Sequence, residues 1–176
     1  MSSIIESNNI LEIYKYCKNL IDGNNNVVLF LDIDDTILSS QIDIKLIDPN
    51  SKHLIELIYR TMPNNLFFLT ARDSECKDST IKELNYVRLL HSEMFICYNV
   101  IHSPYKFENG NFIPTKGETL LNFLNKTTSL SNENPNWIIF VDDDIEQINN
   151  VSKHLTLTSF SHVLFHYQHR NAATLN

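Results

Sequence analysis

Residues 27–36 have the sequence VVLFLDIDDT. The first half is a continuous apolar run with β-branched residues, which is typical of a strand buried on both faces of a parallel sheet. The second half places three aspartates and a threonine directly after that strand. Two other apolar runs also end in polar residues: LFFL at 66–69 precedes Thr70, and WIIFV at 137–141 precedes three aspartates at 142–144. Because ligands bind at the carboxyl ends of the strands in such sheets, the sequence predicts a functional site at this edge.

Segments with helical spacing of apolar residues separate the predicted strands. We expect helices at 3–21, 50–62, 74–90, 116 onward and 145–154, further strands at 95–101 and 156–167, and irregular chain at 37–48. Residues 104–114 are expected to form a β-hairpin that turns at Asn109-Gly110, with Phe107 and Phe112 facing each other across the strands. This order predicts an α/β fold with a mainly parallel sheet flanked by helices. A chain of 176 residues suits one domain spanning residues 1–176.

Composition narrows the classes of partner and the compartment. A net charge of −7 argues against a general nucleic-acid binder, although a bound metal can still draw a phosphorylated substrate to an acidic site. Three cysteines without a CxxC pair indicate neither a disulfide framework nor a zinc site. With no signal-peptide pattern and no membrane-length apolar run, we expect a cytoplasmic protein, while export by a dedicated secretion system stays open. Oligomeric state also stays open.

Carboxylates gathered at one sheet edge repel one another and raise each other's pKa unless a cation lies between them. Hard oxygen ligands of this kind suit Mg²⁺, which prefers one or two carboxylates, several waters and a substrate phosphate. Simpler interpretations exist for each segment. The aspartates after 27–31 could make only turn hydrogen bonds, and those at 142–144 could only cap the helix that follows.

Four segments occur in an order that resembles the haloacid dehalogenase-like (HAD) superfamily of phosphatases. They are DIDDT at 32–36, LTAR at 69–72, KGE at 116–118 and FVDD at 140–143. Each follows a predicted strand or begins a predicted helix, as the four motifs of that superfamily do. More narrowly, the set is similar to a family of small uncharacterised bacterial HAD-like proteins. The resemblance covers residues 27–150 and implies a Rossmann-like HAD fold.

The resemblance implies a role for each matching residue. Asp32 would be the nucleophile that forms an aspartyl-phosphate, and Asp34 would be the general acid and base. Thr70, Ala71, Arg72 and Lys116 would bind the substrate. A Mg²⁺ ion would be held by Asp32, by the backbone carbonyl of Asp34, by Asp143 as the favoured acidic ligand, and by Asp142 directly or through a second layer of contacts. The adjacent Asp144 leaves the choice between Asp142 and Asp143 open.

Two residue types have competing interpretations. Arg72 could hold a substrate phosphate or carboxylate, or could pair only with Asp73 or Glu75. The histidines at 162, 166 and 169 have a spacing that suits neither a compact zinc site nor one helix face, so we do not expect them to bind metal.

Residues 37–65 and 73–115 leave no room for a separate cap domain. In the family this pattern implies an open site and a large substrate, for which a phosphoprotein is the leading candidate. The alternatives are a catalytically silent HAD-like binding protein and a regulatory module whose Asp32 stays phosphorylated.

Overall fold

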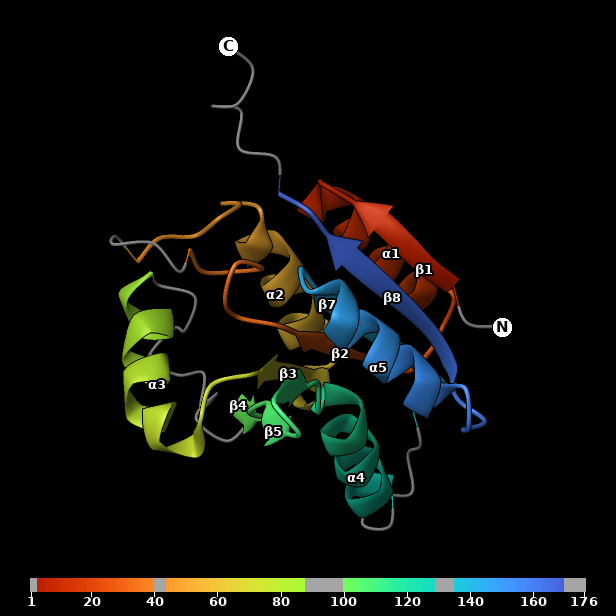
Figure 1. The fold of residues 1–176 in the computed structure, drawn as a ribbon. Helices are drawn as coiled ribbons and strands as arrows, with labels where there is room; N and C mark the ends of the chain where they lie inside the picture. The colour runs from red at the N-terminus through yellow and green to blue at the C-terminus, as the bar shows by residue number, and fades with distance from the viewer. Residues whose placement is uncertain (1–2, 40–43, 88–99, 129–134, 170–176) are drawn as a thin grey trace.

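The computed structural model describes residues 3–39, 44–87, 100–128 and 135–169, along which strands and helices alternate (Figure 1). The strands are β1 (Ser3–Ser7), β2 (Val27–Leu31), β3 (Leu66–Thr70), β4 (Val100–His102), β5 (Lys106–Glu108), β6 (Asn111–Ile113), β7 (Trp137–Asp142) and β8 (Ser161–Tyr167). The α-helices are α1 (Ile10–Asp22), α2 (Ser51–Thr61), α3 (Lys77–Tyr86), α4 (Lys116–Thr128) and α5 (Ile145–Leu155). Short 3-10 helices occupy Pro63–Asn65 and Ser74–Cys76.

Six strands form one sheet in the order β1-β8-β7-β2-β3-β4, and every pair in it is parallel. β2 is buried along its whole length, with β7 on one side and β3 on the other. From β2 the chain continues through β3 to β4 on one side of the sheet, and it later builds β7 and β8 on the other side. The strand order therefore reverses at β2, and the carboxyl ends of β2 and β7 border the position at which such sheets bind ligands.

Helices cover both faces of the sheet, and the alternation of side chains along β2 shows how. Val27, Leu29 and Leu31 pack in one apolar cluster with the buried residues of α1 and α2. Val28 and Phe30 pack in a second cluster with those of α4 and α5. The predicted α/β class with a mainly parallel, helix-flanked sheet is confirmed.

The hairpin is also confirmed. β5 and β6 are antiparallel, and Phe107 lies opposite Phe112. Asn109 and Gly110 turn with positive φ values of 53° and 83°, as the two central residues of a tight hairpin turn require. An ion pair of 2.8 Å between Lys106 Nζ and Glu118 Oε2 ties the hairpin to α4. Among the described residues, the only elements between β2 and α4 besides β3 and β4 are α2, the two 3-10 helices, α3 and this hairpin.

The predicted helix at 3–21 is wrong over its first residues. Residues 3–7 form the edge strand β1, which pairs with β8, and α1 begins only at Ile10. The Asn9 side chain caps the helix by accepting a hydrogen bond of 2.9 Å from the backbone N–H of Leu11. The isoleucines at 4 and 5 fit a helical period by chance. Their partner strand, β8, lies about 160 residues away in the sequence, so the local pattern does not indicate the pairing.

Other predicted boundaries change at the ends of elements. β8 begins at Ser161, not at 156, because residues 156–159 form a turn that leaves Leu157 exposed. The helix expected from residue 74 begins with a 3-10 turn and runs as α3 to Tyr86. The strand expected at 95–101 is described only as β4, from Val100 to His102; residues 88–99, which hold the rest of both predictions, lie outside the described residues.

Candidate active site

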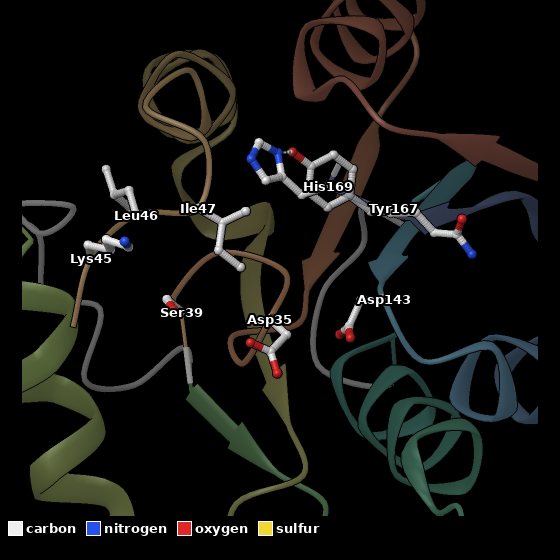
Figure 2. A pocket seen from close by; sticks show the side chains of 9 residues that line it. Asp35, Ser39, Lys45, Leu46, Ile47, Asp143, Tyr167 and His169 are labelled. Carbon is white, nitrogen blue, oxygen red and sulfur yellow. Dashed lines mark hydrogen bonds between the residues drawn. The ribbon is translucent and has the colours of Figure 1, made fainter. Parts of the chain in front are cut away.

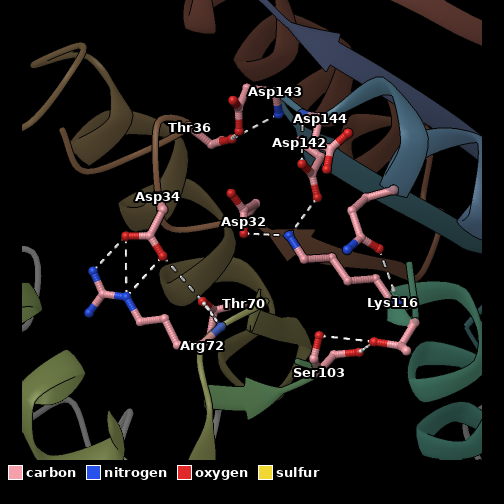
Figure 3. A network of polar contacts seen from close by, with 12 residues as sticks. Asp32, Asp34, Thr36, Thr70, Arg72, Ser103, Lys116, Asp142, Asp143 and Asp144 are labelled. Carbon is pink, nitrogen blue, oxygen red and sulfur yellow. Dashed lines mark hydrogen bonds and ion pairs between the residues drawn. The ribbon is translucent and has the colours of Figure 1, made fainter. Parts of the chain in front are cut away.

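Three parallel strands and one helix bring the predicted site residues to the carboxyl edge of the sheet (Figure 3). Asp32 follows β2, Thr70 ends β3 and Asp142 ends β7, while Lys116 is the first residue of α4. All four are buried.

Lys116 lies between two of these carboxylates. Its Nζ is 2.5 Å from Asp32 Oδ1 and 2.7 Å from Asp142 Oδ2, and only 2% of its side chain is exposed. The two carboxylates outweigh the effect of burial, so the pKa of the ammonium lies above its ordinary value. The lysine therefore stays charged and offsets part of the negative charge at the sheet edge.

The position of Lys116 depends on how the start of α4 is held. The hydroxyl of Thr115 donates to the carbonyl oxygen of Ser103 at 3.0 Å, and the Lys116 N–H donates to Gln147 Oε1 at 3.2 Å. The N–H of Gly117 donates to Asn150 Oδ1 at 2.7 Å. A Cβ at position 117 would lie 2.5 Å from the backbone oxygen of Asn150, so only glycine lets α4 approach α5 this closely.

Asp32, Asp142 and Asp143 form a cluster that could hold a metal ion. Each offers a carboxylate oxygen within 4.8 Å of the others. With Lys116 as the ammonium beside them, three carboxylates face one positive charge. Burial, and to a lesser degree Asp32, raise the pKa of Asp142 well above its ordinary value. The same two causes raise the pKa of Asp143 to about 6, against a hydrogen bond from Thr36 that lowers it. A divalent cation would relieve this excess of negative charge.

The three aspartates after β7 have different contacts. Asp142 uses one oxygen for Lys116 and the other for the N–H of Asp144, at 2.9 Å. Asp144 caps α5 through a hydrogen bond of 2.8 Å from the N–H of Glu146, and it accepts the phenol proton of Tyr105. The helix-cap interpretation therefore applies to Asp144, whereas Asp142 and Asp143 face the cluster.

The hydroxyl of Thr36 holds both the backbone N–H and the carboxylate of Asp143. The threonine oxygen accepts the N–H of Asp143 at 3.0 Å and donates to Asp143 Oδ1 at 3.1 Å. The side chain of Thr36 is fully buried. The sequence does not predict this contact, although Thr36 closes the DIDDT segment and so lies within the pattern that marks the site.

Asp34 lies apart from the acid cluster and points to Arg72 (Figure 3). Arg72 binds it with two nitrogens, Nε to Oδ2 at 2.9 Å and Nη2 to Oδ1 at 2.6 Å. Arg72 Nη1 also pairs with Glu83 of α3 at 2.6 Å, so its partners are neither Asp73 nor Glu75, the pairing that the sequence left as the alternative to substrate binding. Thr70 Oγ1 lies 3.5 Å from Asp34 Oδ2 and accepts a hydrogen bond of 3.2 Å from the N–H of Arg72. Ala71 lies in the bend between Thr70 and Arg72.

A cavity of about 400 Å³ opens beside the acid cluster (Figure 2). Asp35 and Asp143 line one side of it. Ser39, the loop at 45–47, the end of β8 and the following residues 168–169 also line it. The cavity and the metal-ligand candidates therefore share Asp143.

The histidines at 162, 166 and 169 do not gather into a metal site in the part of the chain that the structure describes. His166 instead contacts Glu6 and the carbonyl oxygen of Asp143. No helix in the described ranges is long and apolar enough to cross a membrane.

A family described as a protein of unknown function (DUF2608) matches residues 41–174, and the chain belongs to it. Among solved structures, the HAD domain of the Legionella pneumophila effector protein Lem4, as an inactive mutant, matches with a TM-score of 0.52 and 17% identity over 84% of this chain and 87% of that one. A second structure of that domain has a TM-score of 0.47 and 16% identity over 84% of this chain and 88% of that one. No curated protein matches. The chain therefore has a HAD-like fold.

Proposed function

We propose that this protein is a Mg²⁺-dependent phosphomonoester hydrolase that works through an aspartyl-phosphate on Asp32. The single observation that carries the proposal is the buried contact of Lys116 with Asp32 and Asp142, beside Asp143, at the carboxyl edge of a HAD-like sheet. A buried lysine between two carboxylates is costly as a purely structural feature, because the ammonium and both carboxylates lose hydration. It is well suited to a site that receives a phosphate dianion.

The proposed reaction has two displacements. The Asp32 carboxylate attacks phosphorus, the bond from phosphorus to the leaving oxygen breaks, and Asp34 gives that oxygen a proton. Water then attacks the phosphorus of the aspartyl-phosphate, Asp34 takes a proton from the water, and inorganic phosphate leaves with the Asp32 carboxylate restored. Lys116 and the hydroxyl of Thr70 stabilise the charge on the phosphoryl oxygens.

The donor set fits Mg²⁺. Only one carboxylate oxygen of Asp143, Oδ1, accepts a hydrogen bond from Thr36. Asp142 uses both of its oxygens, one for Lys116 and one for a backbone N–H. We therefore favour Asp143 over Asp142 as the direct acidic ligand beside Asp32. The ion, when bound, would draw negative charge from the phosphoryl group. The backbone carbonyl of Asp34 is the further ligand that the family resemblance implies.

For the substrate we propose a phosphoprotein. Among the described residues, the chain between β2 and α4 supplies no folded unit that could enclose a small metabolite. The cavity beside Asp143 is large enough for a single side chain and its near neighbours. A cytoplasmic location remains a prediction. The description of Lem4 as an effector supports the alternative, which is export by a secretion system.

The test is hydrolysis of p-nitrophenyl phosphate and of a phosphotyrosine peptide with Mg²⁺, comparing wild type with Asp32→Asn and Asp34→Asn. We expect Asp32→Asn to be inactive. Asp34→Asn should accumulate protein that carries one phosphoryl group, detected by intact mass, since the second displacement lacks its base. Equal steady turnover in Asp34→Asn would overturn the role of that residue.

A silent binding protein is the second candidate, and the pairing of Asp34 favours it. Two nitrogens of Arg72 hold the carboxylate that would have to transfer protons. A wild type that binds Mg²⁺ and a phosphate analogue but turns over neither substrate would support this candidate.

A further inference from the structure

We propose that His166, anchored by Glu6 of the edge strand β1, is a positioning residue that holds Asp143 in place for the cation; this inference rests on the proposed function. Glu6, His166 and Asp142 lie in register across the neighbouring strands β1, β8 and β7. His166 is therefore between the edge of the sheet and the acid cluster.

Both nitrogens of the His166 ring are in use. Nε2 donates to the carbonyl oxygen of Asp143 at 3.0 Å, and Nδ1 lies 2.8 Å from Glu6 Oε2. A weaker contact of 3.4 Å joins Nε2 to the side-chain amide of Gln168. The His166 side chain is 9% exposed, whereas the Glu6 side chain is 64% exposed. A buried ring thus links a surface carboxylate to the backbone of a metal-ligand candidate.

Together with Thr36, His166 holds the backbone of Asp143 on both sides of its Cα atom. Thr36 holds its N–H and one oxygen of its carboxylate, and His166 holds its carbonyl oxygen. With the peptide groups on both sides of the residue fixed, the carboxylate cannot swing without breaking one of these bonds. Mg²⁺ tolerates little departure from octahedral geometry, so the position of this ligand bears directly on affinity.

The competing explanation is that His166 only satisfies a buried carbonyl and contributes to stability. β8 supplies a matched control. His162 is also a buried histidine of this strand, at 5% exposure, but it lies at the opposite end and contacts the carbonyl oxygen of Phe160. Replacing either residue by alanine removes one buried imidazole from the same strand, and only His166 contacts the acid cluster.

The experiment is calorimetric titration of MgCl₂ into the full chain, comparing wild type, His166→Ala and His162→Ala. We expect His166→Ala to weaken Mg²⁺ binding about 10- to 100-fold, as loss of a contact that orients a metal ligand does, and His162→Ala to leave it unchanged. Equal affinity in all three proteins, or an equal loss in both variants, would overturn the positioning role.

Two milder variants cover the case in which His166→Ala does not fold. His166→Gln can still donate to the Asp143 carbonyl and should bind Mg²⁺ more tightly than His166→Ala; Glu6→Gln removes the anchoring charge at the surface and should weaken binding severalfold. Wild-type affinity in Glu6→Gln would remove β1 from the proposal. A wild type that binds no Mg²⁺ would overturn the metal dependence of the proposed function, and this inference with it, whereas binding unaffected by His166 overturns this inference alone.

Discussion

Arg72 contributes to the site through Asp34. Its guanidinium makes a two-nitrogen contact with that carboxylate, and Glu83 and Thr80 of α3 hold the far side of the same group. A planar guanidinium fixes the direction of a carboxylate in a way that the single ammonium of lysine does not. At the residue scale, the orientation of the proposed acid and base therefore depends on a neighbour.

Arg72→Lys tests this dependence. We expect kcat for p-nitrophenyl phosphate to fall about 10- to 100-fold with KM nearly unchanged, because Asp34 is misplaced while the phosphate contacts remain. Steady-state kinetics provide the measurement, with Arg60→Lys, an exposed arginine of α2, as the control. A rise in KM with kcat intact would instead assign Arg72 to substrate binding, as the sequence first suggests.

The raised pKa of Asp143 makes the stability of the folded chain depend on pH. Its pKa of about 6 in the folded chain lies above the usual value near 4, so between about pH 4 and 6 the folded state keeps a proton that the unfolded chain releases. Its contribution to stability therefore falls as pH rises through this window. Asp143→Asn, which keeps an acceptor for Thr36, should stabilise the metal-free protein at pH 7.5 by up to about 1 kcal/mol, after allowance for partial exposure, or about 2–4 °C in Tm.

The measurement is thermal unfolding with a chelator at pH 7.5 and at pH 4. Most of the gain should disappear at pH 4, where the carboxyl is protonated in the folded state and about half protonated in the unfolded chain. Glu56→Gln, at a partly exposed position of α2 away from the cluster, is the control. A variant less stable than wild type at pH 7.5 would contradict the prediction.

At the element scale, the contact between α4 and α5 sets where Lys116 lies. The first turn of α4 is held by hydrogen bonds to Gln147 and Asn150 of α5. The hairpin joins the same region through Lys106 and Glu118. The approach of these two helices thus fixes the reach of the lysine toward Asp32.

Gly117→Ala should disturb that contact. Alanine normally favours a helix over glycine by about 1 kcal/mol, but here the added Cβ would meet a backbone oxygen of α5 at 2.5 Å. We expect a net loss of about 1–3 kcal/mol in the free energy of unfolding, measured by urea denaturation, together with reduced turnover as Lys116 shifts. Asn122→Ala, at an exposed position of the same helix, should be neutral or slightly stabilising. Unchanged stability in Gly117→Ala would show that α4 can move away without cost.

At the scale of the whole molecule, an acidic chain concentrates buried negative charge at one end of its sheet. The net charge is −7, and the cluster places three carboxylates against one ammonium. Self-repulsion of this kind destabilises the metal-free fold, and a bound divalent ion stabilises the folded state by mass action.

Mg²⁺ should therefore raise Tm. At about 100 times its dissociation constant, an ion that binds only the folded state adds about 2.7 kcal/mol, which corresponds to roughly 5–10 °C for a chain of this size. Differential scanning fluorimetry measures the shift, and NaCl at matched ionic strength separates binding from screening. Asp32→Asn and Asp143→Asn should lose most of the shift; an equal shift in these variants would place the ion elsewhere.

The central sheet and the chain positions of the candidate site could be predicted from the sequence. The runs at 27–31, 66–69 and 137–141 are apolar enough to be strands only if both faces are buried, and each ends at a polar residue that lies at the site edge. The Asn109-Gly110 turn was equally predictable, because positive φ at both positions suits few other pairs. Local sequence carries this information, since an apolar run and the two central residues of a tight turn are each contained in a few adjacent positions.

Features that depend on partners distant in the sequence could not be predicted and emerge from the three-dimensional structure. β1 is a strand because the edge of β8 accepts it, and Arg72 selects Asp34 and Glu83 over its sequence neighbours because α3 brings Glu83 within 2.6 Å. The division of roles among Asp142, Asp143 and Asp144 likewise follows from Lys116, Thr36 and Tyr105, which reach them from other elements. Such choices depend on three-dimensional proximity between residues far apart in the chain, which a single sequence does not encode in any local pattern.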